Sequence, residues 1–189
     1  MTVELEHWHD FYVLVGTAGA TLLALLFVAV SLGAGFLNEA RAAATRTFYS
    51  PVIIHFASVF FISAIALVPA HRSIYFAALI GACAVVGFSV SFYVTVQLLR
   101  HDWTHYKEDH LAYALLPAIA YLALLVAAAM IWAENALALD FLSAALLLLL
   151  LINIRNAWDL MLSMVRHQTA RRRKKDASRA ASPRPSRPF

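Results

Sequence analysis

Four polar residues gather near the end of the last long apolar run of this chain, 137–162. They are Asn153, Arg155, Asn156 and Asp159. On an α-helix these positions fall within an arc of about 160°, which is one half of the helix surface. A charged group inside a membrane costs at least about 2.5–3.5 kcal/mol and usually has a function there, such as an ion or substrate path.

The two charged members of this group, Arg155 and Asp159, are four residues apart and can form a pair on one helix face. A cation that precedes an anion near a helix C-terminus is the less favourable order for the helix dipole. Local helix stability therefore does not explain the pair, and a role in tertiary structure explains it better.

Matching depths in neighbouring runs extend the group into a predicted intramembrane polar layer. The layer comprises Arg155, Asp159, Asn153, Asn156, His55, Gln97 and Tyr93, and Tyr113 and Tyr121 in the span 112–132 lie in the same half of the membrane. One interpretation is a polar pocket or a cytoplasmic vestibule. The other is that Arg155 extends toward the headgroups, Asp159 lies among them and His55 packs between helices.

The remaining histidines have carboxylates nearby, and imidazole with carboxylate suits zinc, nickel, copper or iron. No spacing here matches a known metal motif, and solvated polar residues at the membrane surface have the same composition. We therefore expect no metal and no cofactor. The weak candidates for a metal ligand are His7, His9, His71, His101 and His105.

Motifs for catalysis are absent from the sequence. It contains no nucleophile elbow, no phosphate-binding glycine loop and no two-histidine zinc-protease motif. Intramembrane haem usually needs paired histidines, whereas His55 is the only histidine deep in an apolar run. The single cysteine, Cys83, excludes a disulfide framework. We expect a protein that is not an enzyme.

The composition is that of an integral membrane protein. Of the 189 residues, 62% are hydrophobic and 14% are charged, against about 45–50% and about 25% in soluble domains. A bilayer requires about 20 apolar residues per helix. The sequence predicts an all-α bundle with five transmembrane helices, at 11–37, 51–69, 73–99, 112–132 and 137–162, with Pro51 in the first turn of the second.

The orientation of this transmembrane domain, 11–165, follows from its basic residues. Residues 1–10 are acidic and contain no Lys or Arg, so they do not resemble a cleaved signal peptide. With the N-terminus outside, thirteen basic residues lie inside and one lies outside. The positive-inside rule therefore predicts an N-out, C-in topology.

The last segment, 166–189, contains three prolines and no apolar periodicity, and we expect it to be a disordered cytoplasmic tail. It carries a block of basic residues that either binds anionic lipid headgroups or serves as a topology signal. The block consists of Arg171, Arg172, Arg173, Lys174 and Lys175.

Small residues at four-residue spacing predict how the helices pack, because they let membrane helices approach closely. One face has Gly16, Ala20 and Ala24, and another has Gly87, Ser91 and Thr95. We expect spans 11–37 and 73–99 to be central and parallel. The leucine run 146–151 has no small or polar face and is expected to face lipid.

The first span resembles a family of small bacterial polytopic membrane proteins, some of whose members are labelled "modulator of FtsH protease". The likeness rests on Trp8-His9-Asp10-Phe11 followed by VGTAGATLLALLFVAVSLG, on Leu67-Val68-Pro69 and on Asn156-Ala157-Trp158. The chain differs from the family at Gly33 and Asp159. The resemblance implies a multi-pass protein of the bacterial inner membrane and supplies no catalytic residues.

Together these features predict a non-enzymatic accessory or interaction module of a larger membrane complex. The alternative is a small oligomeric transporter or channel that uses the polar layer. The expected partners are the lipid bilayer and either a larger membrane complex or further copies of this chain, and no nucleic acid is expected.

Overall fold

The computed structural model describes residues 6–34, 39–69, 73–100 and 107–181, and these are helical apart from short turns. The all-α prediction is therefore confirmed for the part of the chain that is described. The helices are α2 (His9–Ala34), α3 (Glu39–Ala66), α4 (Ser73–Arg100), α5 (Lys107–Trp132) and α6 (Ala138–Ala181).

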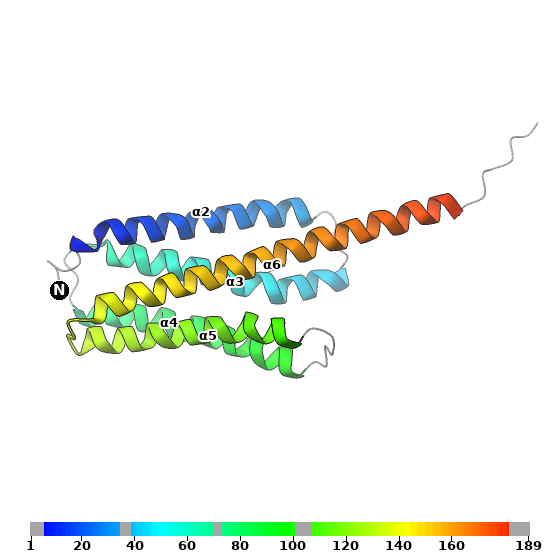
Figure 1. The fold of residues 1–189 in the computed structure, drawn as a ribbon. Helices are drawn as coiled ribbons and strands as arrows, with labels where there is room; N and C mark the ends of the chain where they lie inside the picture. Colours follow the sequence, from blue (N-terminus) through cyan, green and yellow to red (C-terminus); the bar gives the residue numbers. More distant parts are fainter. Residues whose placement is uncertain (1–5, 35–38, 70–72, 101–106, 182–189) are drawn as a thin grey trace, which may run out of the picture.

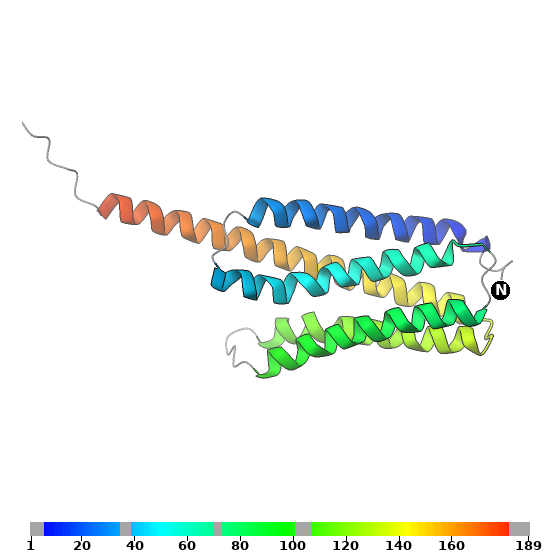
Figure 2. The same cartoon turned by 180° about the vertical axis from the view of Figure 1, so that it is seen from behind.

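The five helices lie side by side and alternate in direction (Figure 1). The start of α2 lies at the same end of the bundle as the end of α3, the start of α4 and the α5–α6 connection. The C-terminal part of α6 extends beyond the other end as an isolated helix, as the opposite view also shows (Figure 2).

Four helices are long and apolar enough to cross a membrane, which indicates a multi-pass membrane protein. Their apolar segments are His9–Ala29, Ser73–Gln97, Leu115–Trp132 and Ala138–Asp159. The fifth, Pro51–Ala66 of α3, is shorter.

Helix α3 begins well before the predicted start of the second span. It starts at Glu39, so Pro51 lies inside the helix and not in its first turn. Four alanines between Glu39 and Ser50 favour the helix. The missing N–H of proline removes one hydrogen bond, which neighbouring groups in membrane bundles can compensate.

Helix α6 likewise differs from the predicted disordered tail, because it continues to Ala181. Residues 166–181 are rich in Arg, Lys and Ala, which favour helix, and the three prolines all lie beyond Ala181. Extending an existing helix avoids the cost of nucleating a new one. Composition alone did not reveal this effect.

The prediction that spans 11–37 and 73–99 form the central pair is wrong, although α2 and α4 do run in the same direction (Figure 1). Helix α2 packs mainly on α3, and α4 packs mainly on α5. Over an 18-residue apolar stretch of each helix, 28% of the residues of α2 and of α4 are buried, whereas 56% are buried in α6. The leucine run is not simply lipid-facing, because Leu146, Leu149 and Leu150 are buried. Six consecutive leucines cover every face of a helix, so the sequence cannot show which face is inside.

The small-residue face of α2 meets α3 along only part of its length. A Cβ atom at Gly16 would lie 3.0 Å from the Cβ of Ser63, and one at Gly19 would lie 3.3 Å from Cγ1 of Val59. Ala20 is half-buried and Ala24 is exposed. The close approach is therefore confined to the first half of α2.

Candidate functional site

A tyrosine from α5 fills a space on α4 that only glycine leaves open. Tyr121 is fully buried, and a Cβ atom at Gly87 would overlap its ring. On the same face of α4, the hydroxyls of Ser91 and Thr95 donate hydrogen bonds within their own helix, to the carbonyls of Gly87 and Ser91. The glycine thus determines where the tyrosine hydroxyl reaches.

That hydroxyl lies in a chain of hydrogen bonds on α3. The Tyr121 hydroxyl donates to Oγ of Ser58 at 3.0 Å, and Ser58 donates to the carbonyl of Ile54 at 2.8 Å. Nδ1 of His55 lies 2.9 Å from the Tyr121 oxygen. The His55 and Tyr121 ring centroids are 5.3 Å apart.

The directions of these bonds determine the histidine tautomer. Ser58 uses its one proton on Ile54 and therefore accepts from Tyr121. The tyrosine proton is then committed to Ser58, so His55 must donate from Nδ1–H to the tyrosine oxygen. A neutral histidine protonated at Nδ1 satisfies this chain.

Helix α4 joins the same cluster through its cysteine. The half-buried Cys83 lies close to Ser58 and Tyr121. We call His55, Ser58, Cys83 and Tyr121 the buried polar cluster. Its members come from α3, α4 and α5. Because His55, Ser58 and Tyr121 are buried, a substrate has little access to the cluster.

A second buried contact joins α6 to α3. Nδ2 of Asn153 donates to the carbonyl of Val52 at 3.2 Å. Its Oδ1 atom is buried and has no hydrogen-bond partner among the described residues. Asn156, one turn further along α6, is buried too. These asparagines continue the inward face of Leu146 and Leu149.

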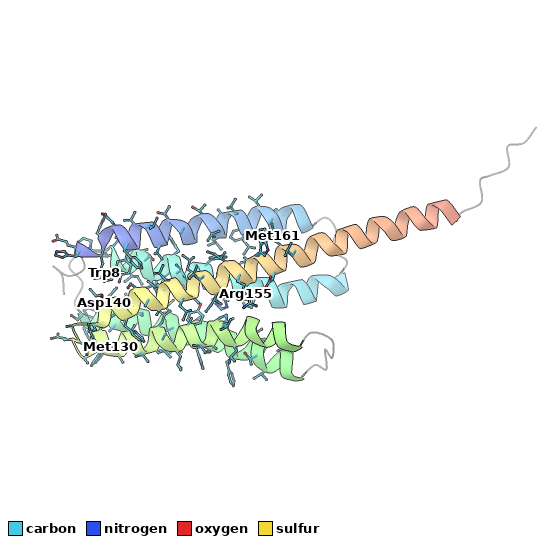
Figure 3. All side chains as sticks on the ribbon, viewed as in Figure 1. Trp8, Met130, Asp140, Arg155 and Met161 are labelled. Carbon is cyan, nitrogen blue, oxygen red and sulfur yellow. The ribbon has the colours of Figure 1, made fainter. Side chains whose placement is uncertain are left out.

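The charged pair of α6 faces out of the bundle. Nε of Arg155 lies 4.0 Å from Oδ2 of Asp159, and the two side chains are 56% and 58% exposed. Figure 3 shows Arg155 on the stretch of α6 that still lies beside the other helices. The pair is therefore on the outer surface of the bundle and not in an internal pocket.

The predicted polar layer is thus divided between different surroundings. His55, Asn153 and Asn156 are buried, Arg155 and Asp159 face outward, and Gln97 donates to the exposed Tyr93 within α4 at 2.8 Å. The four polar residues of α6 span about 160° of the helix surface. That arc includes part of the buried side and part of the exposed side, so the four residues do not share one environment.

Two members of the buried polar cluster, Ser58 and Cys83, were not predicted as site residues. The one sequence signal for Ser58 is its three-residue spacing from His55, which places both on one face of α3. Nothing in the sequence pointed to the contact between Cys83 and Ser58.

Among the side chains that the structure describes, no group of three or more His, Cys, Asp or Glu could hold a metal ion. His9 lies 3.3 Å from the Asp10 carboxylate, and His7 has an interaction of its own. His71, His101 and His105 lie outside the described residues. The side chains of Arg171–Lys175 also lie outside those described.

Comparison with known proteins gives no further assignment: no family model, no curated protein and no solved structure matches this chain.

Proposed function

We propose that this chain is a non-enzymatic accessory protein that binds other proteins within a membrane through the outer face of α6. The observation that carries the proposal is the exposed pair of Arg155 and Asp159. Charged side chains facing hydrocarbon are costly, and a protein partner that covers them lowers that cost. A purely lipid-facing surface has no use for them.

The interior of the bundle supports the same proposal. The hydroxyls and imidazole of the buried polar cluster bond to one another or to the backbone. Such a satisfied network makes a bundle rigid. A rigid bundle that presents a fixed outer face suits an interaction module.

A transporter or channel is the second candidate, and the orphan Oδ1 of Asn153 favours it. A buried acceptor without a partner is a place where water or a polar substrate can bind. In this alternative, water or the solute passes Asn153 between α3 and α6, and Arg155 and Asp159 lie on the outer surface of the same stretch of α6.

For the topology we propose five spans in the bacterial inner membrane, with the N-terminus outside and the C-terminus inside. The end of α2, the start of α3, the end of α4 and the start of α5 lie at the end of the bundle where α6 leaves it (Figure 1). Residues 39–46, Arg100, Lys107 and the last segment, 166–189, contain thirteen of the fifteen basic residues, which supports a cytoplasmic location for that end. The resemblance of the first span makes a membrane-bound protease the first partner to test.

The experiment is affinity capture of the tagged chain from its own membranes in mild detergent, with quantitative mass spectrometry. We expect a stoichiometric larger partner that is lost with Asp159→Asn. It should be retained with the matched control Asp140→Asn, an exposed acid in the first turn of the same helix (Figure 3). Recovery of this chain alone, together with solute flux in liposomes that Arg155→Leu abolishes, would instead support a transporter.

A further inference from the structure

The exposed side of α6 repeats with a heptad pattern. We start at Leu137, one residue before α6, and step along the chain by four and three residues in turn. Every residue reached in this way is exposed. These residues are Leu137, Phe141, Ala144, Leu148, Leu151, Arg155, Trp158 and Leu162. We call this set the α6 seam. Two of its members, Leu151 and Trp158, are 64% and 65% exposed.

Among the helices that the structure describes, none covers this side of α6. In Figure 1 α6 lies in front of α3. In Figure 2, which shows the opposite side, α6 lies behind α3. The buried side of α6 packs against α5 and α3 and, to a lesser degree, α2. The seam is therefore accessible along the bundle.

Exposed apolar residues also occur on α2, α4 and α5, where lipid can cover them. The seam differs in its charge. Of the apolar segments His9–Ala29, Pro51–Ala66, Ser73–Gln97, Leu115–Trp132 and Ala138–Asp159, only the last contains Lys or Arg. Leu162 is the last residue of the predicted span 137–162 and lies seven residues after Arg155, about 10 Å along the helix. Arg155 is therefore inside the apolar run. Lipid tails are poor surroundings for such a pair.

The open faces of α2 and α4 have the same spacing of exposed residues, so the charges and not the spacing set the α6 seam apart. The spacing of four and three residues allows two such helices to pair in a left-handed supercoil. Most helix pairs in membrane bundles have this geometry. Two copies inserted in the same membrane have the same orientation, so a twofold axis along the membrane normal makes their α6 helices parallel. Each seam position then meets the same region of the other copy.

The charges make the seam self-complementary. Arg155 belongs to the seam, and Asp159 lies beside Trp158 on its edge. Pairing two copies brings two guanidinium groups and two carboxylates into one neutral set. The internal pair is long, at 4.0 Å through Nε, and a second carboxylate can accept from the remaining N–H groups of each arginine.

We propose that the α6 seam is the interface of a parallel homodimer, in which Arg155 of each copy pairs with Asp159 of the other. This interface goes beyond the accessory function, because it assigns the exposed side of α6 to a second copy of the chain, with which a different protein would compete for Arg155 and Asp159.

Disulfide trapping in native membranes tests the position of the interface. We expect Leu151→Cys and Leu148→Cys to give a cross-linked dimer on mild oxidation. The matched control is Val86→Cys, an exposed apolar position of α4, and the unmodified chain gives the background from Cys83. Cross-linking at Leu151 no greater than at Val86 overturns the proposal.

Charge exchange tests whether the pairing is between copies. Arg155→Asp leaves two acids on one chain, and Asp159→Arg leaves two bases on the other. We expect each variant alone to lose self-association by about tenfold, equivalent to about 1.4 kcal/mol. Co-expressed with different tags, the two variants should capture each other, since the opposite charges now meet only across the interface.

Association of the mixed variants that is no stronger than that of either variant alone overturns the interface, and so does a wild-type chain that is monomeric in dilute liposomes. Self-association with no foreign partner in the capture experiment leaves the dimer standing and removes the accessory function. A chain that is monomeric but still captures a foreign partner overturns the dimer and supports the accessory function.

Discussion

The ring of Tyr121 on α5 occupies the space that a side chain at Gly87 on α4 would need. This contact positions the tyrosine hydroxyl between His55 and Ser58 of α3. One glycine of α4 therefore supports hydrogen bonds between α3 and α5. The consequence is that a very small change at Gly87 disturbs polar groups on a different helix.

Gly87→Ala should lower the free energy of unfolding by about 1–3 kcal/mol, the usual cost of inserting a methyl group into a tightly packed interior. The matched control is Gly81→Ala on the same helix, where a new Cβ would meet Ala128 at an ordinary 3.8 Å. That change should be neutral, or stabilising by up to about 1 kcal/mol, because alanine favours helix. Tryptophan fluorescence during unfolding by SDS in mixed micelles measures both. Equal effects would mean that the ring of Tyr121 moves aside freely.

Tyr121→Phe should destabilise the bundle by about 1–2 kcal/mol, because it leaves the Nδ1–H of His55 buried without an acceptor. Tyr93→Phe removes a hydroxyl that is exposed and bonds only within α4, so it should change stability by less than about 0.5 kcal/mol.

A double-mutant cycle with His55→Leu checks this assignment. Once the imidazole is gone, Tyr121→Phe should cost at least about 0.5 kcal/mol less than it does alone, since the two residues share one bond. Additive effects would contradict the hydrogen bond between them.

The sequence was sufficient to predict the helical class and the approximate position of each apolar helix, because hydrophobic run length is a direct property of the residues. It did not reveal which side of each helix is inside. In a membrane, lipid-facing and protein-facing surfaces are both apolar, so Leu146 and Leu147 look alike although one is buried and the other exposed.

The candidate site shows the same limit. The position of His55 in the apolar run 51–69 was enough to predict its depth in the membrane. Its hydrogen-bond partner could not be predicted, because Tyr121 is 66 residues away in the chain. Arg155 and Asn156 are adjacent in sequence and lie on opposite sides of the boundary between the interior and the surface. That boundary depends on where α3 and α5 pack, which helical periodicity does not specify.

The proposed topology predicts different labelling at the two ends of the transmembrane domain. With five spans, Glu6→Cys and Ala133→Cys should react with a membrane-impermeant maleimide in intact cells, since both positions are exposed at one end of the bundle. Ser178→Cys, in the last segment of the chain, should react only after permeabilisation. The unmodified chain reports any reaction at Cys83. Labelling of Glu6→Cys and Ser178→Cys on the same side would contradict the odd number of spans.

Asn153→Leu should leave stability unchanged or raise it by up to about 1 kcal/mol, because the present side chain makes one long bond and buries an unpaired carbonyl oxygen. Leucine has a similar size and would extend the inward face of Leu146 and Leu149. Asn153→Asp should be destabilising by several kcal/mol if the acid stays ionised, since it places an uncompensated charge in the interior. The same SDS unfolding assay compares the three chains. A loss of about 2 kcal/mol or more with leucine would mean that Oδ1 has a partner, such as bound water, and would favour the transporter candidate over a closed interior.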